Sequence, residues 1–225
     1  MRASLALPSA GGTPRPAVIV LHEIYGLNDD IRRIAARFAA EGYVALAPDL
    51  FDGRGPRLLC VARTLRALMH GRGPAFLDLE AARLWLCKRP EVDESKLGVV
   101  GFCMGGGFAT LFAVRAPLDV AAPFYGATPK SVEALMGICP VVASCGDQDR
   151  FFVPQAQRLG RHLEELGVPH DLKLYPGVGH SFMNKQSGLM AKVMAKGPMT
   201  VGYNEEAAED AWRRMLSFFA EHLEA

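Results

Sequence analysis

The strongest chemical signal in the sequence surrounds Cys103. The stretch Gly101-Phe102-Cys103-Met104-Gly105 joins an apolar, strand-like run to a helical pattern, and it has the form G-x-nucleophile-x-G. Glycine suits both positions because larger side chains there would collide with the neighbouring backbone in so sharp a turn. The unpaired N–H groups at the start of the helix would stabilise a thiolate and a developing oxyanion. We therefore expect Cys103 to be a nucleophile.

A glycine-rich turn between a strand and a helix can instead bind phosphate, so dinucleotide binding is an alternative. The dinucleotide pattern G-x-G-x-x-G is not met, because Cys103 occupies its second glycine position. The Gly-Lys-Ser/Thr ending of a P-loop is missing as well. The sequence thus disfavours a dinucleotide-binding oxidoreductase.

Two later segments supply partners for the thiol. Asp147 and Asp149 follow an expected strand at 141–145, and His180 lies on a glycine-flanked loop after an expected strand at 171–175. The chain order nucleophile, acid, histidine is that of α/β-hydrolase triads. We expect His180 to share a proton with Cys103 and Asp149 to orient the imidazole, with Asp147 as the rival acid.

An unusual acid, Glu23, follows the first expected parallel strand. The loop at this position commonly lends a backbone N–H to an oxyanion hole, so we expect the amides of Ile24 and Met104 to be the donors. A carboxylate beside a thiol opposes its ionisation. Our hypothesis is that Glu23 keeps Cys103 as a resting thiol and takes its proton when substrate displaces the carboxylate. The structural alternative for Glu23 is a salt bridge or a cap at the start of the next helix.

The other cysteines and histidines lack such surroundings. No CxxC pair and no zinc-finger spacing is present, so we expect no metal site and no disulfide framework. We expect four cysteines to be buried small hydrophobes: Cys60, Cys87, Cys139 and Cys145. We expect five histidines to be surface or packing residues: His22, His70, His162, His170 and His222.

Apolar runs and helical patterns alternate along the chain. This alternation predicts an α/β fold with a mostly parallel central sheet and helices on both faces, in a single domain over residues 1–225. The expected strands are 17–21, 43–47, 97–101, 120–125, 141–145 and 171–175, and the expected helices are 28–41, 58–69, 77–88, 104–115, 155–166 and 205–223.

Two irregular segments interrupt this pattern. Residues 51–74 are rich in glycine and arginine, and residues 185–202 carry three methionines with glycines and a proline. Both are candidate lids over a pocket, since methionine side chains adapt to irregular ligands. Packing over the edge of the sheet is the alternative for each.

Charge and hydropathy exclude several classes of protein. The formal net charge is +1, which indicates neither nucleic acid nor an anionic membrane as a partner. No apolar run has the length of a membrane span. The N-terminus lacks the apolar core of a secretory signal, and free thiols suit a reducing compartment. We expect a cytoplasmic monomer or homodimer.

The segments around Glu23, Cys103, Asp149 and His180 resemble the dienelactone hydrolase family (carboxymethylenebutenolidase-like) of the α/β-hydrolase superfamily. The similarity runs from about Ala17 to the C-terminus, and further segments share it: 42–50, 78–82 and 124–126. The resemblance implies an α/β-hydrolase fold and cofactor-free hydrolysis through a thioester acyl-enzyme. It also implies a Cys103, His180 and Asp149 triad, with Glu23 as the activating carboxylate.

The chain departs from this family at its substrate contacts. Family members that open dienelactones carry an arginine shortly after the His-Ser-Phe segment, where this chain has Asn184. Asn184 and Tyr125 are candidate substrate contacts, and Arg54 or Arg57 is a candidate for a second arginine. The chain also begins where the family's second strand would lie, so we expect the antiparallel edge strand to be missing.

Together these features predict a cysteine-dependent hydrolase of a lactone or an activated ester. A good leaving group is expected because a thiolate expels poor ones slowly. A thioesterase or acyltransferase is the enzymatic alternative. A non-catalytic protein whose Cys103 traps electrophiles or senses oxidants is the other alternative.

Overall fold

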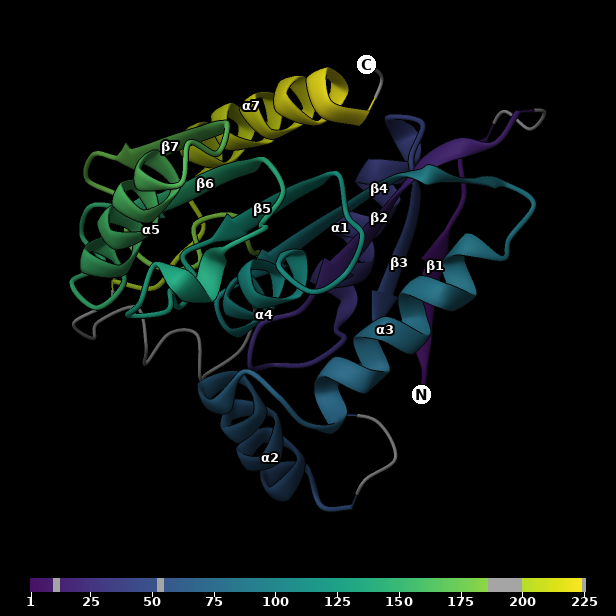
Figure 1. Ribbon diagram of the computed structural model, residues 1–225, viewed down its shortest axis with the longest axis horizontal. Helices are drawn as coiled ribbons and strands as arrows, with labels where there is room; N and C mark the ends of the chain where they lie inside the picture. Colours follow the sequence, from purple (N-terminus) through teal and green to yellow (C-terminus); the bar gives the residue numbers. More distant parts are fainter. Residues whose placement is uncertain (10–12, 52–54, 186–199, 224–225) are drawn as a thin grey trace.

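A seven-stranded sheet forms the centre of the molecule (Figure 1). The computed structural model describes residues 1–9, 13–51, 55–185 and 200–223. The strand order is β1-β3-β2-β4-β5-β6-β7. Strands β2 to β7 run parallel, and β1 pairs with β3 in the antiparallel sense. The strands are β1 (Ala3–Ala6), β2 (Arg15–Leu21), β3 (Val44–Pro48), β4 (Val92–Phe102), β5 (Val120–Phe124), β6 (Val141–Gly146) and β7 (His170–Tyr175).

Helices cover both faces of the sheet, which confirms the predicted architecture. Helices α1 and α7 pack on one face, while α3, α4 and α5 pack on the other (Figure 1). The helices are α1 (Asp29–Ala40), α2 (Arg57–His70), α3 (Pro74–Cys87), α4 (Met104–Ala113), the short 3-10 turn η1 (Glu133–Leu135), α5 (Val153–Glu165) and α7 (Glu205–Leu223). None of the described helices is long and apolar enough to cross a membrane.

The central strands are apolar where both of their faces are buried, as in residues 17–21 of β2 and 97–102 of β4. In β2, Val18 and Val20 contact the core beneath α1 and α7, whereas Ile19 and Leu21 contact the opposite core. Successive side chains of a strand point to opposite faces, so a strand between two helical layers needs apolar residues at every position. This is why the run at 17–21 carries no alternation.

The expectation that the antiparallel edge strand is missing was wrong. Residues Ala3 to Ala6 form β1 and pair with Pro48 to Ala45 of β3. Four residues that include two alanines carry little strand propensity of their own. The strand forms because β3 otherwise presents an unpaired edge of N–H and C=O groups.

The two candidate lids are only partly described. Residues 52–54 and most of 185–202 lie outside the described residues. Within 51–74, the expected helix is present as α2, and its Ala67 joins the core beneath α3 and α4. A lid role for either segment stays a prediction.

Candidate active site

Cys103 stands on the turn between β4 and α4, in a conformation that few residues adopt. Its backbone has φ 55° and ψ −113°, and its N–H donates to the carbonyl of Phe124 at 3.1 Å. A Cβ at Gly101 would lie 2.0 Å from the carbonyl oxygen of Gly105, and a Cβ at Gly105 would lie 2.4 Å from that of Leu21. The two glycines are therefore required by the close approach of α4 to β2 and β4.

Three chemically active side chains meet at this turn. The Cys103 sulfur, a ring nitrogen of His180 and a carboxylate oxygen of Glu23 all lie within 4.8 Å of one another. Glu23 and His180 are buried, and Cys103 is half-buried. The three residues follow β2, β4 and β7, and the carboxyl ends of these strands share one edge of the sheet.

Asp149 and two aromatic rings fix the imidazole of His180. The His180 Nδ1 lies 2.5 Å from Oδ2 of Asp149, and both side chains are buried. The rings of Tyr125 and Phe152 each have their centroids 4.9 Å from that of His180. Because Asp149 accepts the Nδ1 proton, Nε2 is the ring atom left to exchange a proton. This Nε2 is buried and forms no hydrogen bond with any described residue.

The protonated form of His180 is favoured in this setting. Burial lowers the pKa of His180, but the hydrogen bond to Asp149 and the adjacent sulfur of Cys103 raise it more strongly. The resulting pKa is about 10 instead of 6.5. An imidazolium beside Cys103 can stabilise a thiolate and can protonate a leaving group.

The rival acid, Asp147, is turned away from the imidazole. Its Oδ1 accepts hydrogen bonds from the Gly177 backbone and from the Gln148 side chain, both at 2.8 Å, and it is exposed. Asp147 stabilises the turn after β6. Asp149 is the acid that contacts His180.

Ser181 and His22 hold Glu23, a role that the sequence did not predict for either residue. Ser181 Oγ donates to Glu23 Oε1 at 2.5 Å. The His22 Nδ1 lies 2.6 Å from the Glu23 carbonyl, and its Nε2 accepts from the Leu50 N–H at 3.0 Å. Burial lowers the pKa of His22 below 6.5, so the ring is neutral and carries its proton on Nδ1. The only signal in the sequence was position: His22 directly precedes Glu23, and Ser181 directly follows His180.

The expected oxyanion donors lie in the turns that follow β2 and β4. Met104 is the first residue of α4, so its N–H has no acceptor within the helix. Ile24 follows Glu23 in a turn that the Gly26 N–H closes onto the Glu23 carbonyl at 3.1 Å. The oxyanion hole itself stays a prediction.

Tyr125 and Asn184 bind each other in the structure. The Tyr125 hydroxyl donates to Asn184 Oδ1, and Asn184 Nδ2 donates to Asp30 Oδ2 at 2.9 Å. Burial and the neighbouring carboxylate of Glu23 raise the pKa of Tyr125 well above 10, so the phenol stays protonated. Both side chains are buried, and their polar groups serve this network. Their role as substrate contacts stays a prediction.

Backbone strain is concentrated at this site. Four non-glycine residues among those described have a positive φ, and three of them belong to this site. They are Cys103 itself, Tyr125, which packs against His180, and Ser181, which binds Glu23. Such conformations are costly and persist where the surrounding packing enforces them, which is common in active sites.

The Glu23, Cys103 and His180 set also offers the donor types that bind zinc.

The remaining cysteines are free thiols away from this cluster. Cys60 and Cys145 are buried as expected, whereas Cys87 and Cys139 are only partly buried. Burial raises the pKa of Cys139 and of Cys145 to about 12, so both are inert thiols at neutral pH.

Residues 1–223 match the model of the dienelactone hydrolase family. The chain belongs to the dienelactone hydrolase family. A relative from Saccharolobus solfataricus is named "Putative carboxymethylenebutenolidase" and is 30% identical to this chain. The match covers 97% of this chain and 93% of the relative. Members of this family are esterase-like hydrolases, so hydrolysis is the class of reaction.

Solved structures agree with this assignment of the dienelactone hydrolase family. The crystal structure of P91, a dienelactone hydrolase-like promiscuous phosphotriesterase from metagenomic libraries, has a TM-score of 0.80 and 26% identity, covering 98% of this chain and 92% of P91. MGS-M1, an α/β hydrolase from a deep-sea metagenome, has a TM-score of 0.62 at 16% identity, covering 94% of this chain and 86% of MGS-M1, and shows the shared fold.

Proposed function

We propose that this protein hydrolyses a lactone or an activated ester through a thioester acyl-enzyme on Cys103. The observation that supports this most directly is the position of the thiol. It lies on a strained elbow at the start of α4, with a histidine nitrogen and a carboxylate oxygen within 4.8 Å. A nucleophile, a proton carrier and a second acid or base are the groups that acyl transfer requires.

The first half-reaction forms the thioester. Glu23 accepts the proton of the Cys103 thiol, and the sulfur attacks the carbonyl carbon of the substrate. The Ile24 and Met104 amides stabilise the oxyanion. When the tetrahedral intermediate collapses, the ester C–O bond breaks, and the imidazolium of His180 gives its proton to the leaving oxygen. In a lactone this oxygen stays attached to the acyl chain.

The second half-reaction restores the enzyme. The neutral His180 takes a proton from water, and the resulting hydroxide attacks the thioester carbonyl. The C–S bond breaks, the acid product leaves, and the Cys103 thiolate recovers its proton from Glu23. Asp149 stays ionised throughout and keeps the Nδ1 proton in place.

The substrate needs a good leaving group, because the tetrahedral intermediate otherwise expels the thiolate. Enol lactones, enol esters and aryl esters meet this requirement. No relative named above points to acyl transfer or to non-catalytic redox sensing, so we propose neither alternative.

The decisive experiment compares the wild type with Cys103→Ala on phenyl acetate and on an aryl lactone. Cys87→Ala is the matched control, because Cys87 is a partly buried thiol outside the cluster. We expect Cys103→Ala to lower kcat/KM by about 1,000-fold or more, and Cys87→Ala to leave it unchanged. Rapid acid quench should trap an acyl group on Cys103. Full activity of Cys103→Ala, or acyl label on another residue, would overturn the proposal.

A further inference from the structure

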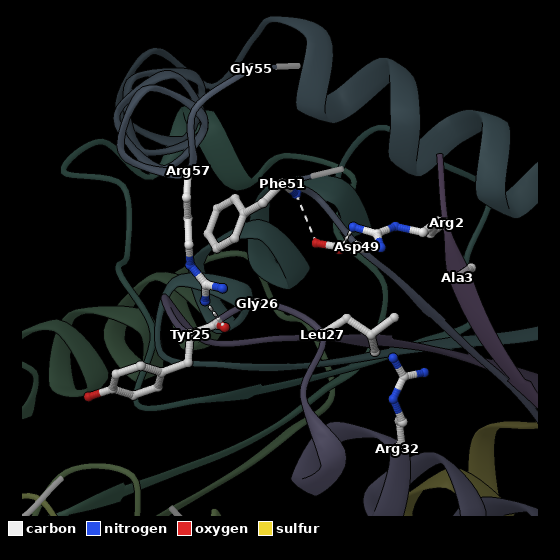
Figure 2. A pocket seen from close by; sticks show the side chains of 10 residues that line it. All are labelled: Arg2, Ala3, Tyr25, Gly26, Leu27, Arg32, Asp49, Phe51, Gly55 and Arg57. Atoms are coloured by element: carbon white, nitrogen blue, oxygen red, sulfur yellow. Dashed lines mark hydrogen bonds and ion pairs between the residues drawn. The ribbon is translucent and has the colours of Figure 1, made fainter. Parts of the chain in front are cut away.

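A cavity of about 520 Å³ lies beside the loop that follows β2 (Figure 2). The described residues that line it include Arg2, Arg32, Arg57, Asp49 and Phe51. The volume is in the range of small-molecule sites. Cys103, Glu23 and His180 are not among the residues that line this cavity, one wall of which is the loop from Tyr25 to Leu27.

Three arginines reach this cavity from three separate elements. Arg2 precedes β1, Arg32 lies in α1, and Arg57 is the first residue of α2. Figure 2 shows their guanidinium groups approaching from three sides. Like charges repel one another, so gathering them here costs free energy unless a negative charge offsets it.

Among the described residues, carboxylates lie near two of these arginines, Arg2 and Arg32. Asp49 lines the cavity and lies 3.6 Å from Arg2. Its Oδ1 also accepts the Phe51 N–H at 3.1 Å. Arg32 is 3.8 Å from Asp29, whose side chain is fully exposed to solvent.

Arg57 brings positive charge without a matching acid. Its guanidinium donates to the Tyr25 carbonyl, and among the described residues no carboxylate lies within ion-pair distance of it. The planar guanidinium keeps further N–H donors for a second acceptor. An anion in this cavity would therefore find Arg57 donors that the described residues leave unused.

Apolar surface accompanies the charge. The ring of Phe51 stands between Arg57 and Asp49, and the Leu27 side chain faces the same space from the opposite wall (Figure 2). A ligand that has both an anionic head and an apolar body would contact both kinds of surface. A bare inorganic ion would use only the arginines.

We propose that this cavity is a second ligand site, separate from the Cys103 site, which binds a small organic phosphate. The guanidinium groups hold the phosphate dianion, and Phe51 and Leu27 pack against the organic group. Arginine suits this role because its N–H groups pair with two phosphate oxygens at once.

The test is calorimetric titration of the full-length protein with phenyl phosphate and with inorganic phosphate at low ionic strength. The variants are Arg57→Gln and Arg32→Gln. Arg66→Gln is the matched control, since Arg66 is exposed on α2 and does not line the cavity. Thermal unfolding of each variant verifies its fold, and a Cys103→Ala protein reports on binding at the nucleophile.

We expect saturable binding of phenyl phosphate that is weakened about tenfold by Arg57→Gln and by Arg32→Gln. Arg66→Gln and Cys103→Ala should bind like the wild type, and inorganic phosphate should bind more weakly than phenyl phosphate. The proposal is overturned if the wild type shows no saturable binding. It is also overturned if Arg66→Gln weakens binding as much as the other two, which would indicate a diffuse surface charge, or if Cys103→Ala abolishes binding.

Discussion

Ser181 Oγ lies 2.5 Å from Glu23 Oε1, although the two residues are 158 positions apart. Ser181 directly follows His180 and has a positive φ of 60°. One short loop therefore places both the imidazole that faces Cys103 and the hydroxyl that holds the neighbouring carboxylate. The orientations of Glu23 and His180 toward the thiol are linked through this loop.

Removal of the Ser181 hydroxyl should release Glu23. A hydrogen bond to a charged group contributes about 1.5–3 kcal/mol, so we expect Ser181→Ala to lower kcat/KM about tenfold to a hundredfold. Ser181→Gly separates the loss of the hydroxyl from backbone strain, because glycine also lacks the hydroxyl but adopts the positive φ without strain. Both variants should shift the pH profile of Cys103 alkylation. If Ser181→Gly keeps full activity and an unchanged profile, the hydroxyl does not position Glu23.

Loss of the Asp149 charge should leave the imidazole wrongly oriented. Asp149→Asn would favour the tautomer with its proton on Nε2, which cannot accept a proton from water there. We expect kcat/KM for phenyl acetate to fall by about 1,000-fold or more. Asp147→Asn, which alters a turn residue, should retain most activity. Equal losses in the two variants would show that Asp149 has no special role.

The raised pKa of His180 predicts how the free energy of unfolding depends on pH. The folded-state pKa is about 10, against 6.5 for an ordinary histidine. The charged form thus stabilises the fold fully below pH 6.5, and this contribution is lost as the pH rises through 10. We expect the difference in unfolding free energy between wild type and His180→Gln to be larger at about pH 6 than at about pH 11. His170→Gln, at an exposed position, is the control.

Gly105 and Gly160 should respond to alanine in opposite directions. At Gly105 the new Cβ would lie 2.4 Å from the Leu21 carbonyl oxygen, backbone that cannot move aside cheaply. We expect Gly105→Ala to destabilise the protein by about 3 kcal/mol or more. Gly160 lies within α5, and its Cβ would meet only Leu172 Cδ1 at 3.4 Å. Gly160→Ala should stabilise by about 0.5–1 kcal/mol. Chemical denaturation measures both.

The clustered donors predict inhibition by zinc. Cys103, His180 and Glu23 offer sulfur, nitrogen and oxygen atoms within 4.8 Å of one another, and Zn²⁺ favours such ligands. We expect Zn²⁺ to block hydrolysis reversibly, with activity restored by a chelator, and to protect Cys103 from alkylation. Magnesium, which favours oxygen ligands, should have no effect. Zinc inhibition that persists unchanged in Glu23→Gln and His180→Gln would place the ion elsewhere.

Much of the fold follows from local patterns in the sequence. The continuous apolar run at 17–21 predicts a strand buried on both faces, and the amphipathic period after Asn28 predicts α1. Six of the seven strands were expected near their observed positions, because each is an apolar run between turn residues. β1 was missed, since four residues of weak propensity become a strand only by pairing with β3.

The elbow and the proposed nucleophile could be inferred from Gly101, Cys103 and Gly105, because a sharp turn imposes its glycine spacing within five residues of chain. The order of Cys103, Asp149 and His180 along the chain follows from the order of the strands that carry them. Local chain geometry and hydrophobic periodicity therefore account for the elbow, for the parallel sheet and for the position of the candidate site at the carboxyl ends of the strands.

Contacts between distant segments depended on packing that no local pattern encodes. The choice of Asp149 over Asp147 came from which carboxylate points at His180 after the turn is folded. The pairing of Ser181 with Glu23 and the gathering of three arginines around one cavity likewise needed several elements to meet. Side-chain direction and distance arise from the packing of helices onto the sheet, so these relationships exist only in the folded protein.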